Sequence, residues 1–270
     1  MRTPAHLLLS LSMSLRFSFQ LRLFIALGFS LLLLALGSSG AHAQTSIPNP
    51  STTLSTPTLA PSGSSAQSSP GQSASQKNKI LILGDSLSAE YGLIKGQGWV
   101  ALLEQKLNTE QLPWHVINAS ISGETTSGGL ARLKSLLATH QPQLVVIELG
   151  ANDALRGLDL KATQSNLLQM TQMSKLAKAK VLLLGMQVPP NYGRQYNEDL
   201  KATFAQVAQK TQVAFVPFFF QGLLNHLNET HESTQATDTW FQADRIHPLA
   251  KAHPYLLQGI WPTLKKSLKD

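Results

Sequence analysis

The sequence predicts an α/β protein with a parallel sheet, on the basis of three observations. Short apolar runs alternate with longer segments whose apolar residues recur at helical spacing, which is typical of a sheet with helices on both faces. One run, residues 144–149, is almost wholly apolar, as expected of a strand buried on both faces. Two runs end in a glycine with polar residues just beyond it, where ligands bind in such sheets. We therefore expect a three-layer α/β/α fold with about five parallel strands in flavodoxin-like order.

The segments follow one another in regular alternation. We expect strands at residues 79–83, 114–118, 144–149, 181–188 and 213–218. We expect helices at residues 97–107, 129–140, 162–179, 196–210 and 248–268. Residues 219–242 lack a clear pattern and are expected to be irregular. In the last helix Pro248 suits the first position, while Pro254 and Pro262 would be tolerated or would kink it.

The first 43 residues have the pattern of a secretory signal peptide. Three arginines and no acidic residue precede an apolar run at residues 23–36, and Ala41-His42-Ala43 is a small-residue cleavage signature. The run is shorter than the roughly 20 residues that span a membrane. We expect cleavage after Ala43 and a periplasmic or secreted product without a stable membrane span, the alternative being an uncleaved N-terminal anchor.

Composition separates the rest of the chain into two parts. Residues 44–76 are mostly Ser, Thr, Pro, Gln and Gly without charge, and are predicted to be a disordered linker. Residues 77–270 have the size of one domain. Removing residues 1–43 would lower the formal net charge from +7 to +4, which does not indicate a nucleic-acid partner. The chain has no cysteine, which excludes disulfides and thiolate metal sites, and we expect neither a cofactor nor a metal.

Ser86 is the first candidate for chemistry. It follows the strand at residues 79–83 in the sequence Gly84-Asp85-Ser86-Leu87-Ser88, so its hydroxyl should lie at the ligand-binding edge of the sheet, on the first turn of a following helix. There the free N–H groups of the helix would favour developing negative charge. From this segment alone the N-cap of that helix is the favoured interpretation of Ser86, and the segment is not a Gly-x-Ser-x-Gly nucleophile elbow.

Two further strand ends carry candidate oxyanion donors. Gly123, in the loop after the second strand, could offer an unobstructed backbone N–H, and Asn152, after the third, a side-chain amide. Each has a structural alternative, since Gly123 could be a turn glycine and Asn152 or Asp153 a helix N-cap. Capping and loop hydrogen bonds are also the better explanation of Asp85 and Asp153.

Asp244-Arg245-Ile246-His247 favours the catalytic interpretation. At this spacing the Asp244 carboxylate can reach Nδ1–H of His247, fix its tautomer and leave Nε2 to accept the proton of Ser86. Alternatively, His247 would be an ordinary residue just outside the last helix. The other histidines, including His226, His231 and His253, have no partners at ligand spacing and should be surface or packing residues.

These four segments together resemble the SGNH (GDSL) hydrolase family. Its blocks correspond here to Gly84-Asp85-Ser86-Leu87-Ser88, Gly123, Gly150-Ala151-Asn152-Asp153 and Asp244-x-x-His247, and the match covers nearly all of residues 77–270. The resemblance is close at residues 118–125, 148–157 and 191–197. Two departures near the site, Glu90 at a glycine-like position and Arg245-Ile246, leave the substrate preference open.

The resemblance implies a monomeric serine esterase or thioesterase acting on small acyl esters and thioesters, among them arylesters, acyl-CoA and lysophospholipids. The catalytic triad would be Ser86, His247 and Asp244, with an oxyanion hole formed by Ser86, Gly123 and Asn152. The loop with Tyr192, Gly193 and Arg194 would bind substrate as a flexible wall, the alternative being a plain surface connection. The alternative functions are a carbohydrate O-acetylesterase acting on exported or cell-wall glycans and a non-catalytic, tethered binding module.

Overall fold

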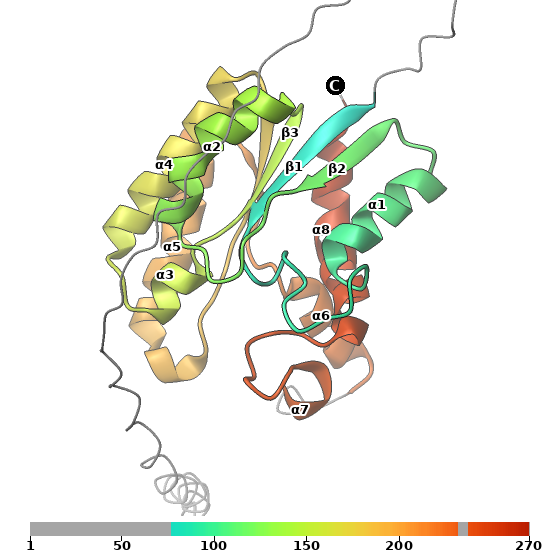
Figure 1. The fold of residues 1–270 in the computed structure, drawn as a ribbon. Helices are drawn as coiled ribbons and strands as arrows, with labels where there is room; N and C mark the ends of the chain where they lie inside the picture. Colours follow the sequence, from blue (N-terminus) through green and yellow to red (C-terminus); the bar gives the residue numbers. More distant parts are fainter. Residues whose placement is uncertain (1–76, 232–236, 270) are drawn as a thin grey trace, which may run out of the picture. The chain divides into compact units, whose positions relative to one another are not determined.

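The computed structural model describes residues 77–231 and 237–269 and contains the predicted parallel sheet (Figure 1). Its five strands lie in the order β2-β1-β3-β4-β5, which is the flavodoxin-like order. Their bounds are β1 (Asn78–Gly84), β2 (Trp114–Asn118), β3 (Leu144–Glu148), β4 (Lys180–Leu184) and β5 (Ala214–Val216). The predicted fold class is therefore confirmed. The predicted signal peptide and linker lie outside the described residues.

The two central strands explain why their sequences are so apolar. Every residue of β3 and residues 80–84 of β1 are buried, because helices cover both faces of the sheet. In the parallel register Gly84 lies opposite Glu148, so the two strands end at the same level. The residues that follow them therefore emerge side by side.

Helices cover the two faces of the sheet (Figure 1). On one face α4 packs against both α2 and α5, and on the other α8 packs against α1 and α6. The bounds of these helices are α1 (Trp99–Thr109), α2 (Thr126–His140), α4 (Leu160–Leu176), α5 (Arg194–Thr211), α6 (Gln221–Glu229) and α8 (His253–Ser267). The short elements are α3 (Ala151–Leu155), α7 (Thr237–Trp240), and the 3₁₀ turns η1 (Pro190–Tyr192) and η2 (Ala250–Ala252).

The C-terminal third departs most from the predicted elements. Helices α6 and α7 lie in the segment expected to be irregular. Gly222 weakened the helical signal of α6, but the structure uses it for close packing, since a Cβ there would lie 2.7 Å from the backbone N of Gly259 in α8. Pro248 does not start the last helix, which begins at His253 after η2, and Pro254 falls within its first turn.

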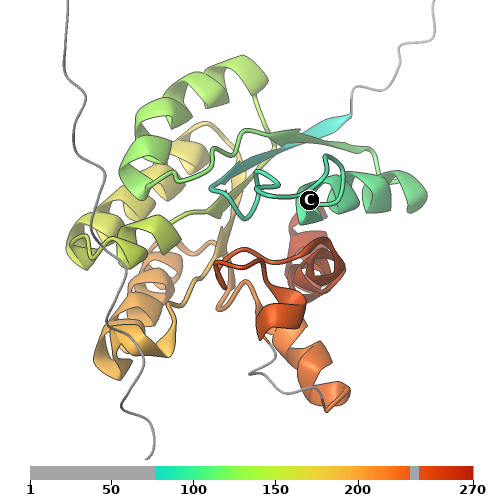
Figure 2. The same ribbon diagram turned by 60° about the horizontal axis from the view of Figure 1, so that its bottom comes forward.

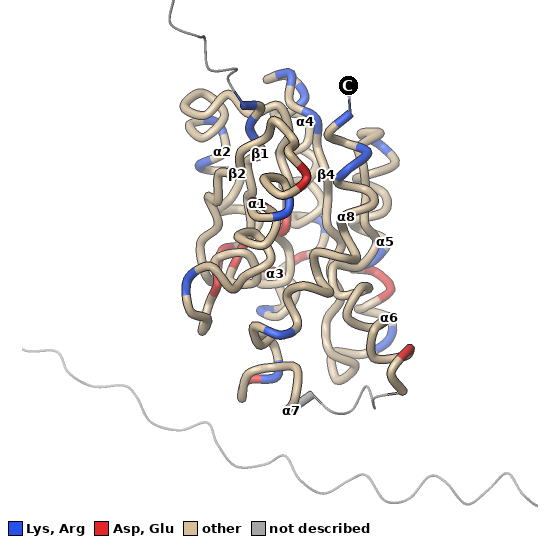
Figure 3. The backbone as a smooth tube through the Cα atoms, turned by 90° about the vertical axis from the view of Figure 1, so that its right-hand side faces the viewer, with Lys and Arg blue, Asp and Glu red and all other residues tan. Residues whose placement is uncertain are grey.

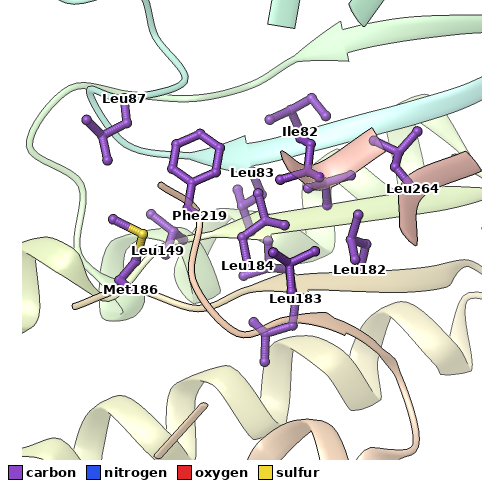
Figure 4. Packing of buried hydrophobic residues seen from close by; sticks show 14 of the residues in the cluster. Ile82, Leu83, Leu87, Leu149, Leu182, Leu183, Leu184, Met186, Phe219 and Leu264 are labelled. Carbon is purple, nitrogen blue, oxygen red and sulfur yellow. The ribbon is translucent and has the colours of Figure 1, made fainter. Parts of the chain in front are cut away.

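A cluster of buried apolar side chains continues to the carboxyl ends of the strands (Figure 4). Leu87, one residue after Ser86, is 5% exposed and belongs to the same buried cluster as Phe219, Leu149 and Met186. The turn that carries Ser86 is thus anchored in the core on one side.

Charge is spread over the fold. Lys and Arg occur on most elements, with a cluster at the end of α8 (Figure 3), where the helix dipole favours cations. Within the described ranges, no helix is both long enough and apolar enough to cross a membrane.

Candidate active site

Ser86 lies in a tight turn directly after β1. The turn is closed by hydrogen bonds from Ser88 N–H and Ala89 N–H to the Asp85 carbonyl, at 3.2 and 2.9 Å. The expectation that Ser86 sits on the first turn of a helix is wrong. Residues 85–98 form turns and α1 starts only at Trp99, so the helix dipole does not contribute at Ser86. The glycines at positions 92, 96 and 98 disfavour a helix there.

The structure brings Ser86, His247 and Asp244 into one hydrogen-bonded series. Ser86 Oγ lies 2.8 Å from His247 Nε2, and His247 Nδ1 lies 2.6 Å from Asp244 Oδ2. A carboxylate can only accept, so the imidazole proton belongs on Nδ1, and Nε2 is left to accept from the Ser86 hydroxyl. In Figure 2 the loop after β1 and the segment before α8 meet at the end of the sheet that faces the viewer.

The Asp244 side chain is held by backbone N–H groups two and three residues further along the chain. Its Oδ1 accepts from Ile246 N–H at 2.9 Å and from His247 N–H at 3.0 Å. Burial alone would raise the pKa of Asp244, but the hydrogen bonds from His247 and Ile246 outweigh it, so this pKa lies below its ordinary value. The carboxylate therefore stays charged beside the imidazole.

An aromatic contact that the sequence did not suggest also fixes His247. The ring of Tyr91 lies against the imidazole with its centroid 4.5 Å away. Glu90 holds the loop that carries Tyr91 through two hydrogen bonds. Its Oε1 accepts from Gly98 N–H at 2.7 Å, and its Oε2 accepts from Gly96 N–H at 3.0 Å. Glu90 has a left-handed backbone with φ of 59°, which agrees with the glycine-like character of the position.

Gly123 occupies the turn for which its residue type is suited. Glu124 N–H donates to the Ile121 carbonyl across the turn, and Gly123 has φ of 77° at the third position, where a type II turn requires glycine. In the described part of the chain, neither Gly123 N–H nor Ser86 N–H has a protein acceptor. Arg156, exposed at the end of α3, donates to the Gly123 carbonyl at 2.8 Å and so contacts the same turn.

Asn152 lies in α3, with its side chain directed at an acid next to Ser86. Its Nδ2 donates to Asp85 Oδ2 at 3.0 Å, while Asp85 Oδ1 accepts from Leu87 N–H at 3.0 Å. The N-cap of α3 is Gly150, so Asn152 does not cap this helix. Asp153 does satisfy a helix start, since it accepts from the N–H and the hydroxyl of Thr126 at the beginning of α2.

Glu148 is a buried acid that sequence reasoning missed. It is 0% exposed at the end of β3, and its Oε2 accepts from Ser88 Oγ at 2.7 Å and from Asp85 N–H at 3.3 Å. A Cβ at Gly84 would lie 2.8 Å from this oxygen, so the carboxyl occupies the space left by that glycine. A single carboxylate in an otherwise apolar strand was the signal, because such a group needs partners.

The remaining candidates take structural positions. His253 is 1% exposed and its Nδ1 accepts from Trp99 N–H at 3.0 Å, while the His226 ring stacks on Tyr255. Across the described ranges, no group of three or more His, Asp or Glu side chains could hold a metal ion. A hollow of about 540 Å³ between α2 and α4 lies at the amino ends of the strands, away from Ser86.

A nucleophilic hydroxyl, an imidazole and a carboxylate in series at the carboxyl edge of a parallel sheet define a serine hydrolase. Residues 82–254 match the model of the GDSL-like lipase/acylhydrolase family. The chain therefore belongs to the GDSL-like lipase/acylhydrolase family, and the function predicted from the sequence, hydrolysis of acyl esters, is confirmed.

The chain is similar to several named enzymes. It is 48% identical to esterase TesA of Pseudomonas aeruginosa over 189 residues, which are 70% of this chain and 89% of that protein. It is 41% identical to thioesterase 1/protease 1/lysophospholipase L1 of Escherichia coli K12 over 183 residues, which are 68% of this chain and 81% of that protein.

Solved structures agree with these relatives. The crystal structure of TesA matches with a TM-score of 0.64 at 47% identity, covering 70% of this chain and 99% of that one. Esterase EstA from Pseudoalteromonas sp., in a form inhibited by monoethylphosphonate, matches with a TM-score of 0.63 at 40% identity and is covered completely by 72% of this chain. The part of this chain that forms the sheet and its helices thus corresponds to whole folded proteins.

Proposed function

We propose that the protein hydrolyses arylesters, acyl-CoA thioesters and lysophospholipids through a Ser-His-Asp triad. The observation that carries this is the continuous series from Ser86 Oγ through His247 to Asp244. The names of the relatives, which include esterase, thioesterase, lysophospholipase and arylesterase, support the substrate classes.

In the first half of the reaction Ser86 Oγ attacks the acyl carbonyl carbon and gives its proton to His247 Nε2. The carbonyl oxygen becomes an oxyanion, which the N–H groups of Ser86 and Gly123 and the Asn152 amide stabilise. The intermediate then expels the alcohol or thiol, which takes the proton from His247. Water repeats these steps on the acyl-Ser86 ester, releases the carboxylic acid and restores the serine.

Tyr192, Gly193 and Arg194 are proposed to form one wall of the acyl site. Tyr192 Oη donates to the Leu155 carbonyl at 3.1 Å, which places η1 beside α3, the helix that carries Asn152. Gly193 has φ of 95° and joins η1 to α5, so the connection turns sharply at this point.

The test is hydrolysis of p-nitrophenyl esters from acetyl to palmitoyl by residues 44–270, with Ser86→Ala alongside. We expect turnover of medium or long chains that disappears in the variant. Activity on acetyl esters alone would indicate a carbohydrate O-acetylesterase instead. Absence of turnover would contradict the proposed function and favour a binding module.

Asn152→Ala tests the oxyanion hole separately. Loss of one donor typically costs about 10²–10³ in kcat, so kcat should fall far more than KM rises. A change in KM alone would show that Asn152 binds substrate without stabilising the oxyanion.

Export is part of the proposal. Residues 1–43 are proposed to be a cleaved signal peptide and residues 44–76 a linker, with a monomeric enzyme in the periplasm or outside the cell. Terminal sequencing of the exported protein should find Gln44 first, whereas an intact N-terminus would indicate a membrane anchor.

A further inference from the structure

Two buried carboxyl groups lie directly behind the proposed oxyanion hole. Asp85, which directly follows β1, is 1% exposed, and Glu148, the last residue of the neighbouring β3, is 0% exposed. Neither takes part in the triad. Burying two acids at one place is costly unless each has a purpose or a partner, so their contacts show what they do.

The contacts distinguish the charged member of the pair from the neutral one. Asp85 accepts from Leu87 N–H through Oδ1 and from the Asn152 amide through Oδ2, as a carboxylate does. Glu148 uses only Oε2, and its buried Oε1 has no hydrogen-bond partner among the described residues. Burial, and then the charge of Asp85, raise the pKa of Glu148 well above its ordinary value, so Glu148 holds the proton.

The charge on Asp85 determines which way the Asn152 amide faces. A carboxylate attracts the amide N–H and repels the amide oxygen, so Nδ2 is directed toward Asp85. Of the two hydrogens on Nδ2, one bonds Asp85 and the second remains for a ligand. If the amide turned over, its oxygen would face the reacting carbonyl oxygen and oppose the negative charge that develops there.

We propose that Asp85, supported by the protonated Glu148, is a positioning residue that orients the Asn152 amide as an oxyanion donor. This rests on the proposed function and adds a residue that acts through Asn152 without touching substrate. Glu148 also accepts from the Asp85 N–H, so it fixes the peptide immediately before Ser86. Ser88, which donates to Glu148, is itself held by Trp99 Nε1 at 3.1 Å.

A double-mutant cycle tests the proposal with residues 44–270. Asp85→Asn gives position 85 an amide that can either donate or accept, so it no longer selects one orientation of Asn152. We expect kcat on a p-nitrophenyl ester to fall about 10²-fold with KM within about threefold. Adding Asn152→Ala to Asp85→Asn should cost little more than Asn152→Ala alone. If the two losses multiply, Asp85 acts independently of Asn152 and the proposal is wrong.

Asp153→Asn is the matched control. Asp153 is also a buried acid next to Asn152, but it accepts from Thr126 and Thr163 and not from the Asn152 side chain. Whatever it costs, its effect should multiply with that of Asn152→Ala. If Asp153→Asn were coupled to Asn152→Ala as strongly as Asp85→Asn is, the site would be loosened in general, and this would contradict a specific role of Asp85.

The pH dependence of kcat gives a second test. Burial raises the pKa of Asp85 to about 6, against the lowering by its hydrogen bonds and by nearby His247. Below that pH Asp85 gains a proton and no longer selects one orientation of the Asn152 amide, so log kcat should fall more steeply with falling pH in the unaltered enzyme than in Asp85→Asn. Equal slopes in the two proteins would refute the proposal. Absence of any turnover in the unaltered enzyme would refute the proposed function instead.

Discussion

The buried groups Asp85 and His253 should make the stability of this protein depend on pH in opposite directions over the same range. Burial raises the pKa of Asp85 from 3.8 to about 6, and burial lowers the pKa of His253 from 6.5 to about 4. For Asp85 the folded state binds the extra proton between these values, so its contribution to stability is present below pH 4 and lost as pH rises to 6. For His253 the unfolded state binds the extra proton, so stability is lost as pH falls from 6.5 to 4.

The magnitudes nearly cancel. Each tenfold change in proton affinity corresponds to about 1.4 kcal/mol. As pH rises through these ranges, the contribution of Asp85 to the free energy of unfolding falls by about 3 kcal/mol, and the contribution of His253 rises by about 3 kcal/mol. Single substitutions should therefore separate two slopes that oppose each other in the unaltered protein. As pH rises from 4 to 7, the free energy of unfolding of Asp85→Asn should increase by about 3 kcal/mol relative to that of the unaltered protein. That of His253→Asn should decrease by about as much relative to the unaltered protein.

Urea unfolding of residues 44–270 at several pH values measures these slopes, and the constant offset from each substitution drops out of the comparison. The Asn side chain at position 253 can still accept from Trp99 N–H, as Nδ1 of His253 does. Parallel curves for the unaltered protein and a variant would show that the substituted group titrates alike in the folded and unfolded states. If the stability difference from the unaltered protein changed with pH in the same direction for both variants, the reasoning would be refuted.

Three further predictions concern backbone geometry and loop contacts. Gly123→Ala should cost about 1 kcal/mol of stability because of its left-handed φ, and it should lower kcat more than it raises KM. Gly157 is also left-handed, so Gly157→Ala should lower stability in thermal unfolding without this effect on kcat. Glu90→Ala keeps a non-glycine residue at a left-handed position and loses two hydrogen bonds from backbone N–H groups, so we expect about 2 kcal/mol of destabilisation. Glu90→Gly should be about 1 kcal/mol more stable than Glu90→Ala, because glycine adopts this φ without strain. Equal stability of the two variants would contradict backbone strain at this position. Gly222→Ala should destabilise by about 1–3 kcal/mol in urea, because its Cβ overlaps the backbone of α8 at Gly259, and an unchanged midpoint would contradict this packing.

The sheet and the meeting of the four segments could be predicted because parallel strands place all their carboxyl ends at one edge. The residues after β1, β2 and β3 had to lie near one another once the alternation of strand and helix was recognised. The hydrogen bond between Asp244 and His247 followed from their separation of three residues. These features depend on local sequence and on the general geometry of the fold.

What the sequence could not supply depends on contacts between distant segments. The Tyr91 ring meets His247 across 156 positions of the chain, and no periodicity indicates such a contact. The turn after β1 replaced the expected helix because Glu90 caps its own loop through glycine N–H groups. Only Glu148 could have been found, as an acid inside a buried strand.

The position of Asp85 raises an electrostatic question, because a negative charge near an oxyanion should slow the reaction. In the proposed mechanism the same step also creates a positive imidazolium at His247, and Asp85 and His247 attract each other electrostatically. Asp85 thus favours one of the two charges that form together, and its carboxylate directs the Asn152 amide toward the other. Because Glu148 stays neutral, the pair brings a single negative charge to the site and not two. A buried acid pair is in this way compatible with a site that must stabilise negative charge.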